Sequence, residues 1–320
     1  VQAAAGAVAA LDVLCSFAAV SVKNDYTRPV VNMSGKLYLK DSRHPVVEAL
    51  LRDAPFVPND VDMDMADNRV AIITGPNMAG KSTYMRQVAI IAIMAQVGCF
   101  VPATVAEIGI IDGIYTRVGA SDDLSAGQST FMIEMTEVAD ILKNATAQSL
   151  VVFDEIGRGT STFDGMSIAR AVLEYVQDKK LVGAKTLFAT HYHELTTLEQ
   201  ELPGVRNFNI AVKKRGEDIT FLRRILPGGA DDSFGIEVAK LAGVPDKVLK
   251  RAREVLRELE SGGAGKPAPR LRLLPKEEPV QLTMDSADSR ALSKLRGLDV
   301  NNMTPMECMN ALFELRKLLG

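Results

Sequence analysis

The feature that most constrains this chain is a glycine-containing turn between an apolar run and a long helix-forming segment. The run 70–73, VAII, is typical of a strand covered on both faces. The turn 75–82, GPNMAGKS, fits the phosphate-binding pattern G-x-x-x-x-G-K-[ST]. Gly75 and Gly80 can adopt backbone angles that a Cβ forbids, so successive N–H groups can face phosphate oxygens. A plain glycine turn is the alternative, but the flanking strand and helix favour a nucleotide site.

The residues around this turn have distinct expected roles. The helix that begins at Lys81 directs the positive end of its dipole toward a bound phosphate. Lys81 can reach the β- and γ-phosphates, and the Ser82 hydroxyl is placed to ligate Mg²⁺. We therefore expect a nucleotide and Mg²⁺ as cofactors; the resemblance described below implies that the nucleotide is ATP or ADP.

The composition is that of an ordinary globular protein with room for about two domains. Of 320 residues, 47% are hydrophobic and 24% are charged. Thirty-seven basic and 40 acidic residues give a net charge of −3, which argues against a broad nucleic-acid-binding face. Cys15, Cys99 and Cys308 are far apart and odd in number, as expected for reduced cytosolic thiols.

The first 20 residues are rich in alanine and form the only candidate membrane span. Alanine contributes little to membrane insertion, and Gln2, Asp12 and Ser16 interrupt the segment, so we expect a buried helix. It is interpreted as the end of a preceding helical domain, and the chain as a fragment of a longer protein.

Alternating apolar and helical patterns predict an α/β fold. Besides 70–73, strands are expected at 36–40, 60–67, 149–153 and 186–190, with an apolar run at 108–114 and a helix at 130–144. Helical patterns separate the three buried strands, so the order β-α-β-α-β implies a mainly parallel sheet with crossover helices.

Beyond Pro227 the pattern becomes helical. Helices are expected at 234–241, 246–260 and 291–298, with a linker rich in Gly, Pro and charge from 261 to about 278. The last helix begins with a capping box, Thr304 to Glu307. Its apolar stripe has no partner in the neighbouring short helices, which favours self-association; the stripe consists of Met309, Leu312, Phe313, Leu315 and Leu319.

Three residues at strand ends are candidates for the chemistry. Asp154 follows four apolar residues, as expected of a carboxylate that holds Mg²⁺. Glu155 points the other way and can polarise the attacking water as a general base. His191 follows the third buried strand, beside the phosphate loop in this sheet order, and can contact the γ-phosphate or that water. A pair of acids closing a strand and a structural histidine are the alternatives.

Several other segments allow two interpretations. The loop with Arg158 either is simply flexible or lies at a subunit boundary near nucleotide. Ser129 or Thr130 is a good N-cap for the following helix, and a capped helix end with a free hydroxyl also suits a phosphate offered by another subunit. His191, His193 and Glu194 lack the further ligands of a zinc site. The basic residues at 247–257 are interleaved with glutamates, which favours a solvated or dimerising helix over DNA reading.

Four motifs together resemble the ATPase domain of the MutS family of DNA mismatch repair proteins. They are TGPNMAGKSTYMRQ (74–87), DDLSAGQSTFMIEMTEVADIL (122–142), DEIGRGTSTFDG (154–165) and ATHYHEL (189–195). RHPVVE (43–48), SFGIEVAKLAGVP (233–245) and the final helix resemble segments of the same family in the same order.

The resemblance implies an ABC-type P-loop ATPase that works as a dimer. Residues 1–28 would end a helical lever, 29–225 form the ATPase domain, 226–260 a dimerising helix-turn-helix, 261–286 a linker and 287–320 an oligomerising tail. Asn77 would touch the γ-phosphate, Phe56 would stack on adenine, and Ser129 and Arg158 would act in trans on the partner's nucleotide. The nucleotide-binding set would be Phe56, Gly75, Pro76, Asn77, Met78, Ala79, Gly80, Lys81, Ser82 and Thr83; the catalytic set Glu155, His191 and Asn77; the Mg²⁺ ligands Ser82 and Asp154.

The same resemblance suggests partners. These are a second copy of the chain, a tetramer through the tail, mismatched DNA in the full-length protein, a MutL-type protein, and a sliding clamp bound through Gln281-Leu282-Thr283-Met284. Asp285 departs from the apolar residue usual in that clamp motif, and Ala79 replaces a more common Gly. A bacterial cytoplasmic, nucleoid-associated location without membrane contact is expected. An oligomerisation scaffold without turnover and a chromosome-clamp or transporter-type ATPase remain the alternatives.

Overall fold

The computed structural model describes residues 1–51, 54–76, 79–119, 129–215, 218–229, 234–262 and 304–319. It consists of two units, 1–254 and 255–320, which are described separately. The elements are α1 (Gln2–Lys23), β1 (Val30–Asn32), β2 (Leu37–Ser42), α2 (Pro45–Leu50), β3 (Asn59–Met63), β4 (Val70–Thr74), α3 (Lys81–Gln96), β5 (Val105–Gly109), β6 (Ile114–Val118), α4 (Thr130–Asn144), β7 (Leu150–Asp154), α5 (Thr162–Gln177), β8 (Lys185–Ala189), the 3₁₀ helix η2 (His193–Thr197), α6 (Leu198–Glu201), β9 (Val205–Arg215), β10 (Asp218–Pro227), α7 (Gly235–Leu241), α8 (Asp246–Gly262) and α10 (Pro305–Leu319).

A six-stranded sheet forms the centre of the first unit. Its order is β10-β9-β4-β8-β7-β6, and neighbouring strands are parallel except for the antiparallel pair β9 and β10. The predicted mainly parallel α/β sheet is therefore confirmed. The order places the carboxyl ends of β4, β8 and β7 side by side, because Ile73 pairs with Ala189 and Ala189 with Asp154.

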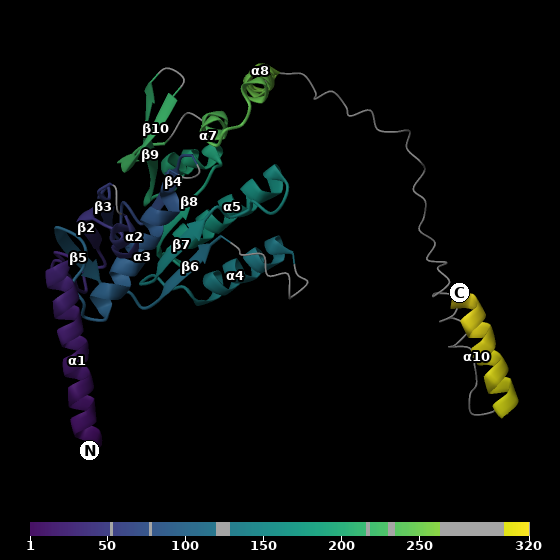
Figure 1. Ribbon diagram of the computed structural model, residues 1–320, viewed down its shortest axis with the longest axis horizontal. Helices are drawn as coiled ribbons and strands as arrows, with labels where there is room; N and C mark the ends of the chain where they lie inside the picture. The colour runs from purple at the N-terminus through teal and green to yellow at the C-terminus, as the bar shows by residue number, and fades with distance from the viewer. Residues whose placement is uncertain are drawn as a thin grey trace. The chain divides into compact units, whose positions relative to one another are not determined.

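The two faces of this sheet are covered by different layers because successive strand residues point to opposite sides. Ala71 and Ile73 pack with α3 and, beyond it, with a second sheet of order β1-β5-β2-β3. Val70 and Ile72 pack on the other face with residues of α4 and α5. Figure 1 shows α3 between the two sheets and α4 and α5 on the opposite side of the large sheet.

The prediction of a buried N-terminal helix is wrong within this chain. Along α1 only Ser21 is buried, and Val8, Leu11 and Leu14 are each more than 60% exposed, because no described element covers these faces. By length and composition this helix could cross a membrane; it is the one such helix among the described residues.

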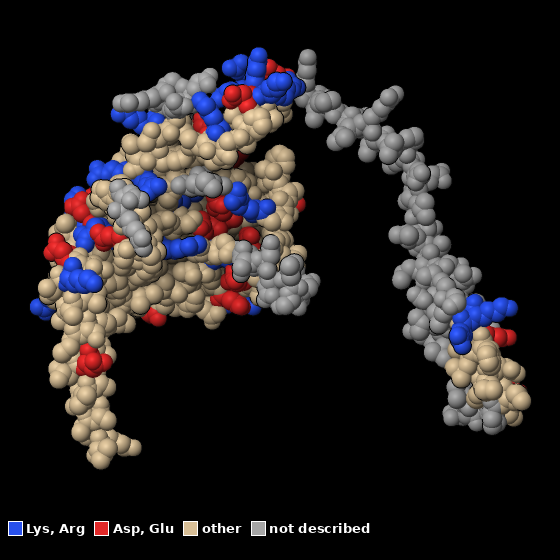
Figure 2. All heavy atoms as spheres, viewed as in Figure 1, with Lys and Arg blue, Asp and Glu red and all other residues tan. Residues whose placement is uncertain are grey.

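The helices after the sheet mostly match the sequence patterns. The helices α7 and α8 are joined by residues 242–245, and α8 continues to Gly262, past its predicted end. Arg251 pairs with Glu254 at 3.1 Å, and Figure 2 shows basic side chains with acidic ones among them in this region, as in a solvated helix. The predicted helix at 291–298 and the clamp motif 281–285 lie outside the described residues.

The second unit contains α10, whose predicted capping box is confirmed. The Glu307 carboxylate accepts hydrogen bonds from the backbone N–H and hydroxyl of Thr304, at 2.8 and 2.7 Å. Met309, Leu312 and Phe313 of its apolar stripe are more than half exposed, whereas Leu315 is buried, so the expectation that nothing covers the stripe is wrong at Leu315.

Candidate nucleotide site

The phosphate-binding turn has the backbone conformation that its glycines predict. Gly75 and Gly80 have φ values of 134° and 111°, which L side chains rarely adopt. Ala79 is not among the described residues with positive φ and is fully buried, so the alanine is accommodated without strain. Gly80 caps α3, whose first residue is Lys81. Asn77 and Met78 lie outside the described residues.

Lys81 is buried inside this turn. Its side chain is 4% exposed, and Nζ donates hydrogen bonds to the carbonyl oxygens of Gly75 and, at 3.3 Å, Pro76. Nζ also lies 3.6 Å from Glu155 Oε1. Burial lowers the pKa of Lys81, and the negative charges of Glu155 and Asp154 oppose that shift. The ammonium thus lies where it can exchange its present acceptors for phosphate oxygens.

Asp154 and Ser82 fit the donor set of a magnesium site. Burial raises the pKa of Asp154, and a hydrogen bond with the Ser82 side chain opposes the shift. Asp154 Oδ1 is buried and has no hydrogen-bond partner among the described residues. A carboxylate and a hydroxyl oxygen are ligands that Mg²⁺ accepts, alongside phosphate oxygens and water. This buried, unpaired oxygen is therefore consistent with a cation beside the phosphate loop.

Glu155 follows β7 in a left-handed backbone conformation with φ 58°. Its N–H donates to the Ala189 carbonyl at 2.9 Å, which fixes the turn against the end of β8. Its carboxylate is 16% exposed and pairs with both Lys81 and Arg158. A left-handed residue that the surrounding structure holds in place is typical of a functional position.

His191 lies two residues beyond β8, at the same edge of the sheet. Burial and the positive charge of Arg158 lower its pKa, and Glu155 opposes this shift. The ring lies against that of Tyr192, with centroids 4.1 Å apart and the planes tilted by 38°. Ala189 of β8 pairs with Asp154 and accepts the Glu155 N–H, so His191, Glu155 and Lys81 lie at the same edge of the sheet.

The loop after Glu155 is held by residues that the sequence did not single out. Gly157 N–H donates to Glu134 Oε1 of α4 at 2.6 Å, and Glu134 Oε2 lies 3.7 Å from the Arg117 guanidinium of β6. Both charged side chains are less than 10% exposed. No local pattern indicates this contact, because the three residues come from separate elements.

The same loop packs against α5 with no space for side chains. A Cβ at Gly165 would lie 2.1 Å from the Gly157 carbonyl oxygen and 2.5 Å from the Tyr192 hydroxyl. Tyr192 in turn donates to the Gly157 carbonyl at 3.1 Å. The backbone just before Arg158 is therefore fixed closely to α5 and to Tyr192, which follows β8.

The predicted adenine contact, Phe56, lines a small cavity of about 110 Å³ beside the phosphate loop. Gly80 and Thr83 line the same cavity, which places Phe56 next to the nucleotide-binding turn. Arg223 of β10 forms another part of its wall. No sequence pattern indicates Arg223, because the irregular pairing of β9 and β10 that brings it here is a tertiary feature.

The two predicted trans residues have contacts within the chain. Ser129 caps α4 by accepting a hydrogen bond from Met132 N–H at 3.2 Å, so the structural interpretation of this residue is confirmed. Arg158 is half exposed, pairs with Glu155 and lines a cavity of about 340 Å³ with Asp154 and Gly159. The loop 120–128 before Ser129 lies outside the described residues.

Comparisons with known proteins agree with this geometry. Residues 71–260 match the family model "MutS domain V", and residues 285–318 match the "DNA mismatch repair protein MutS C-terminal region". Similar proteins include the DNA mismatch repair proteins MutS of Caldicellulosiruptor bescii and Caldicellulosiruptor saccharolyticus, each 56% identical over 99% of this chain. That of Acetivibrio thermocellus is 55% identical over 98% of it.

The chain spans 37% of the length of the two Caldicellulosiruptor relatives. The matched domain has the fold described above, an ABC-type P-loop ATPase domain with a mixed, mainly parallel sheet, followed by α7, α8 and the C-terminal α10. The family model covers more than half of the chain, and the phosphate loop, Asp154, Glu155 and His191 meet at one sheet edge. The chain therefore belongs to the MutS family.

Proposed function

We propose that this chain is the ATP-binding, Mg²⁺-dependent ATP-hydrolysing module of a DNA mismatch repair protein. The observation that carries the proposal is the setting of Lys81, which is buried among phosphate-loop carbonyls and beside Glu155. A buried ammonium held by exchangeable acceptors is prepared to bind a triphosphate. Asp154 and Ser82 would hold Mg²⁺, which would neutralise phosphate charge.

Within this proposal Glu155 acts as the general base and His191 contacts the γ-phosphate or the attacking water. Burial keeps His191 neutral near pH 7, so its ring can accept as well as donate a hydrogen bond. Glu155 must leave its ion pairs with Lys81 and Arg158 before it can polarise water. Binding of the γ-phosphate by Lys81 would release one of them. Asn77 would add a contact to the same phosphate.

The second part of the proposal is a composite site between two copies. Ser129 and Arg158 would meet the partner's γ-phosphate, so that ATP favours a closed dimer and hydrolysis opens it. α7 and α8 would clasp the dimer, and the tail would extend assembly to a tetramer. In the full-length protein this cycle would control a clamp on mismatched DNA and contact with MutL-type and sliding-clamp partners in the bacterial cytoplasm.

A nucleotide-binding scaffold without turnover is the second candidate. It is favoured by one observation, the pairing of the Glu155 carboxylate with two cations, which withdraws it from water. The two candidates differ in what they predict for Glu155→Ala, because only a hydrolase loses activity with this residue.

The test compares the unaltered chain with Glu155→Ala and Lys81→Ala. Fluorescent-nucleotide titration should show normal MgATP binding for Glu155→Ala and lost affinity for Lys81→Ala. Steady-state phosphate release should be lost in both variants. Equal turnover in Glu155→Ala would contradict the general-base role, and normal binding by Lys81→Ala would contradict the phosphate-loop assignment. Sedimentation with and without a slowly hydrolysed ATP analogue then tests dimer closure.

A further inference from the structure

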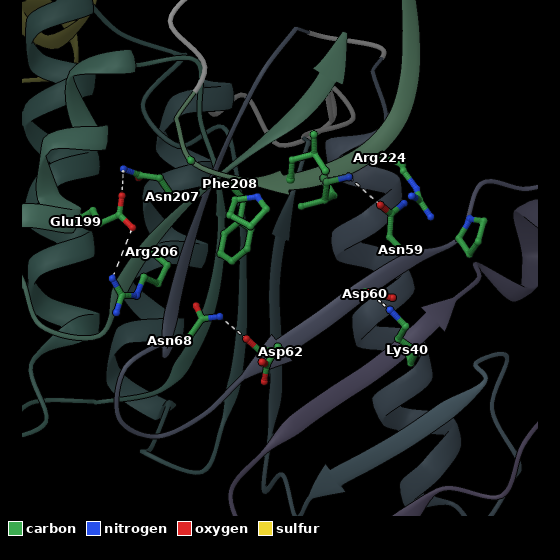
Figure 3. Close-up of a pocket in the computed structure, with 15 residues that line it drawn as sticks. Lys40, Asn59, Asp60, Asp62, Asn68, Glu199, Arg206, Asn207, Phe208 and Arg224 are labelled. Atoms are coloured by element: carbon green, nitrogen blue, oxygen red, sulfur yellow. Dashed lines mark hydrogen bonds and ion pairs between the residues drawn. The ribbon is translucent and has the colours of Figure 1, made fainter. Parts of the chain in front are cut away.

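Asn59, the first residue of β3, separates two cavities of the first unit. It is 8% exposed and lines both the cavity that contains Phe56 and a larger one of about 550 Å³ between β3 and the β9–β10 hairpin. Figure 3 shows the Asn59 side chain reaching from β3 toward β10. A buried amide in this position needs hydrogen-bond partners, because an unsatisfied one is costly.

Both ends of the Asn59 amide bind the backbone of β10. Nδ2 donates to the Arg223 carbonyl at 2.9 Å, and Oδ1 accepts from the Ile225 N–H at 2.8 Å. The β9–β10 register shifts between Phe221 and Ile225, so this one side chain holds the two sides of a bulge. It replaces the ladder hydrogen bonds that a bulge removes.

The bulge positions Arg223 in the wall of the Phe56 cavity. Arg223 has φ 56°, a left-handed conformation that is unfavourable for a residue with a Cβ. Such a conformation persists where neighbouring contacts hold it in place. The hydrogen bond from Asn59 to the Arg223 carbonyl is one such contact.

The other side of Asn59 is connected to the helix that follows the phosphate loop. Ser42 Oγ donates to the Asn59 carbonyl at 2.5 Å, and Gln87 Nε2 of α3 donates to Ser42 Oγ at 2.7 Å. Ser42 and Gln87 are both fully buried. A continuous path of hydrogen bonds therefore runs from α3 through β2 and β3 to the β10 bulge.

We propose that Asn59 is a positioning residue for nucleobase binding, which fixes Arg223 in the wall of the Phe56 cavity and so shapes the part of the site that accepts the nucleobase. This inference rests on the proposed function, since it assigns a residue to one end of the same ATP site. The Asn59 side chain acts through Arg223, whereas its backbone carbonyl is the group that the buried path from Gln87 of α3 reaches through Ser42.

The test measures binding of two ligands by isothermal titration calorimetry on the whole chain. MgATP carries a base, and magnesium tripolyphosphate does not. Asn59→Ala should weaken MgATP binding by about tenfold, through loss of two buried hydrogen bonds that hold the bulge. Tripolyphosphate affinity should stay within about twofold, because the turn at Lys81 is unchanged.

Asn209→Ala is the matched control. Asn209 also donates one side-chain hydrogen bond to the hairpin, to the Gly228 carbonyl at 2.9 Å, but it does not line the Phe56 cavity. It should leave the binding of both ligands unchanged. Asn59→Asp is the second variant, since it keeps the size and one acceptor but replaces the donor to Arg223, and it should reproduce the selective loss even if the alanine variant does not fold.

A double-mutant cycle distinguishes an effect through the position of Arg223 from a general destabilisation of the fold. If Asn59 acts through the bulge, Asn59→Ala should add little to the effect of Arg223→Ala on MgATP binding. Fully additive effects, equal weakening of both ligands, or an equal effect of Asn209→Ala would overturn the inference. Failure of the unaltered chain to bind either ligand would instead refute the proposed nucleotide site, and this inference with it.

Discussion

The buried Glu134 carboxylate offers the sharpest test of how the candidate catalytic loop is held. Its Oε1 accepts the Gly157 N–H at 2.6 Å, and its Oε2 lies 3.7 Å from the Arg117 guanidinium. A hydrogen bond to a charged group contributes about 1.5–3 kcal/mol to stability. Removing one partner of a buried ion pair costs about 3–5 kcal/mol. Arg117 retains Glu137 at 3.1 Å in the variant, which reduces the loss.

We therefore expect Glu134→Ala to lower the free energy of unfolding by about 2–4 kcal/mol. Glu134→Gln keeps an acceptor for Gly157 and removes only the charge, so about half of that loss is expected. Glu137→Ala is the control, because Glu137 is half exposed and its ion pair contributes about 0–1 kcal/mol.

Urea unfolding followed by circular dichroism gives the free energy of unfolding of all three variants. The rate of phosphate release reports whether the loop that follows Glu155 is still held in place. Glu134→Ala should reduce turnover more than nucleotide affinity, because Glu155 and Arg158 lie on either side of the held segment. If Glu134→Ala destabilises the chain no more than Glu137→Ala does, the buried carboxylate is not what holds the loop.

Two further perturbations test other parts of the site. Gly165→Ala would place a Cβ 2.1 Å from the Gly157 carbonyl oxygen, so we expect the free energy of unfolding, measured by heat or urea, to fall by about 1–3 kcal/mol. The control is Gly235→Ala, where a Cβ would meet nothing within 4 Å, and it should be neutral or stabilising. Equal effects of the two variants would refute the close packing. His191 has a lowered pKa in the folded chain, so the unfolded chain binds more protons below about pH 6.5 and stability should fall as the pH drops through that range. His191→Gln should flatten this dependence in unfolding measured from pH 7.5 to 5, and an unchanged slope would contradict it.

Much of the fold could be predicted because its central strands are apolar on both faces. The runs at 70–73, 149–153 and 186–190 correspond to β4, β7 and β8, which lie between α3 on one face and α4 and α5 on the other. The two glycines of the phosphate loop predicted its backbone conformation, because a residue without a Cβ can adopt the positive φ that the turn requires. The spacing of apolar residues and the steric limits on backbone angles can both be inferred from a short stretch of sequence.

The β9–β10 hairpin was not predicted, because it lies at the sheet edge and contains many charges. Arg206, Arg223 and Arg224 leave only short stretches of apolar alternation there, at 208–212 and 219–221. Contacts between distant elements were also missed, and Glu134 and Asn59 are examples, since Gly157 and Arg223, to which they bind, lie 23 and 164 residues away from them. The burial of α1 was predicted from its apolar composition, which says what a helix can bury and not whether the chain supplies a surface to cover it.

The backbone of Glu155 has a consequence for how this chain can change. Its left-handed φ of 58° disfavours glutamate by about 1 kcal/mol relative to glycine, which adopts that geometry freely. Glu155→Gly would relax this turn but delete the carboxylate that faces the buried Lys81, and breaking that pair costs more than the strain that is relieved. Replacement by glycine is therefore not a route to a more stable chain, because the strained turn is held by the charge that this side chain presents to Lys81 and Arg158.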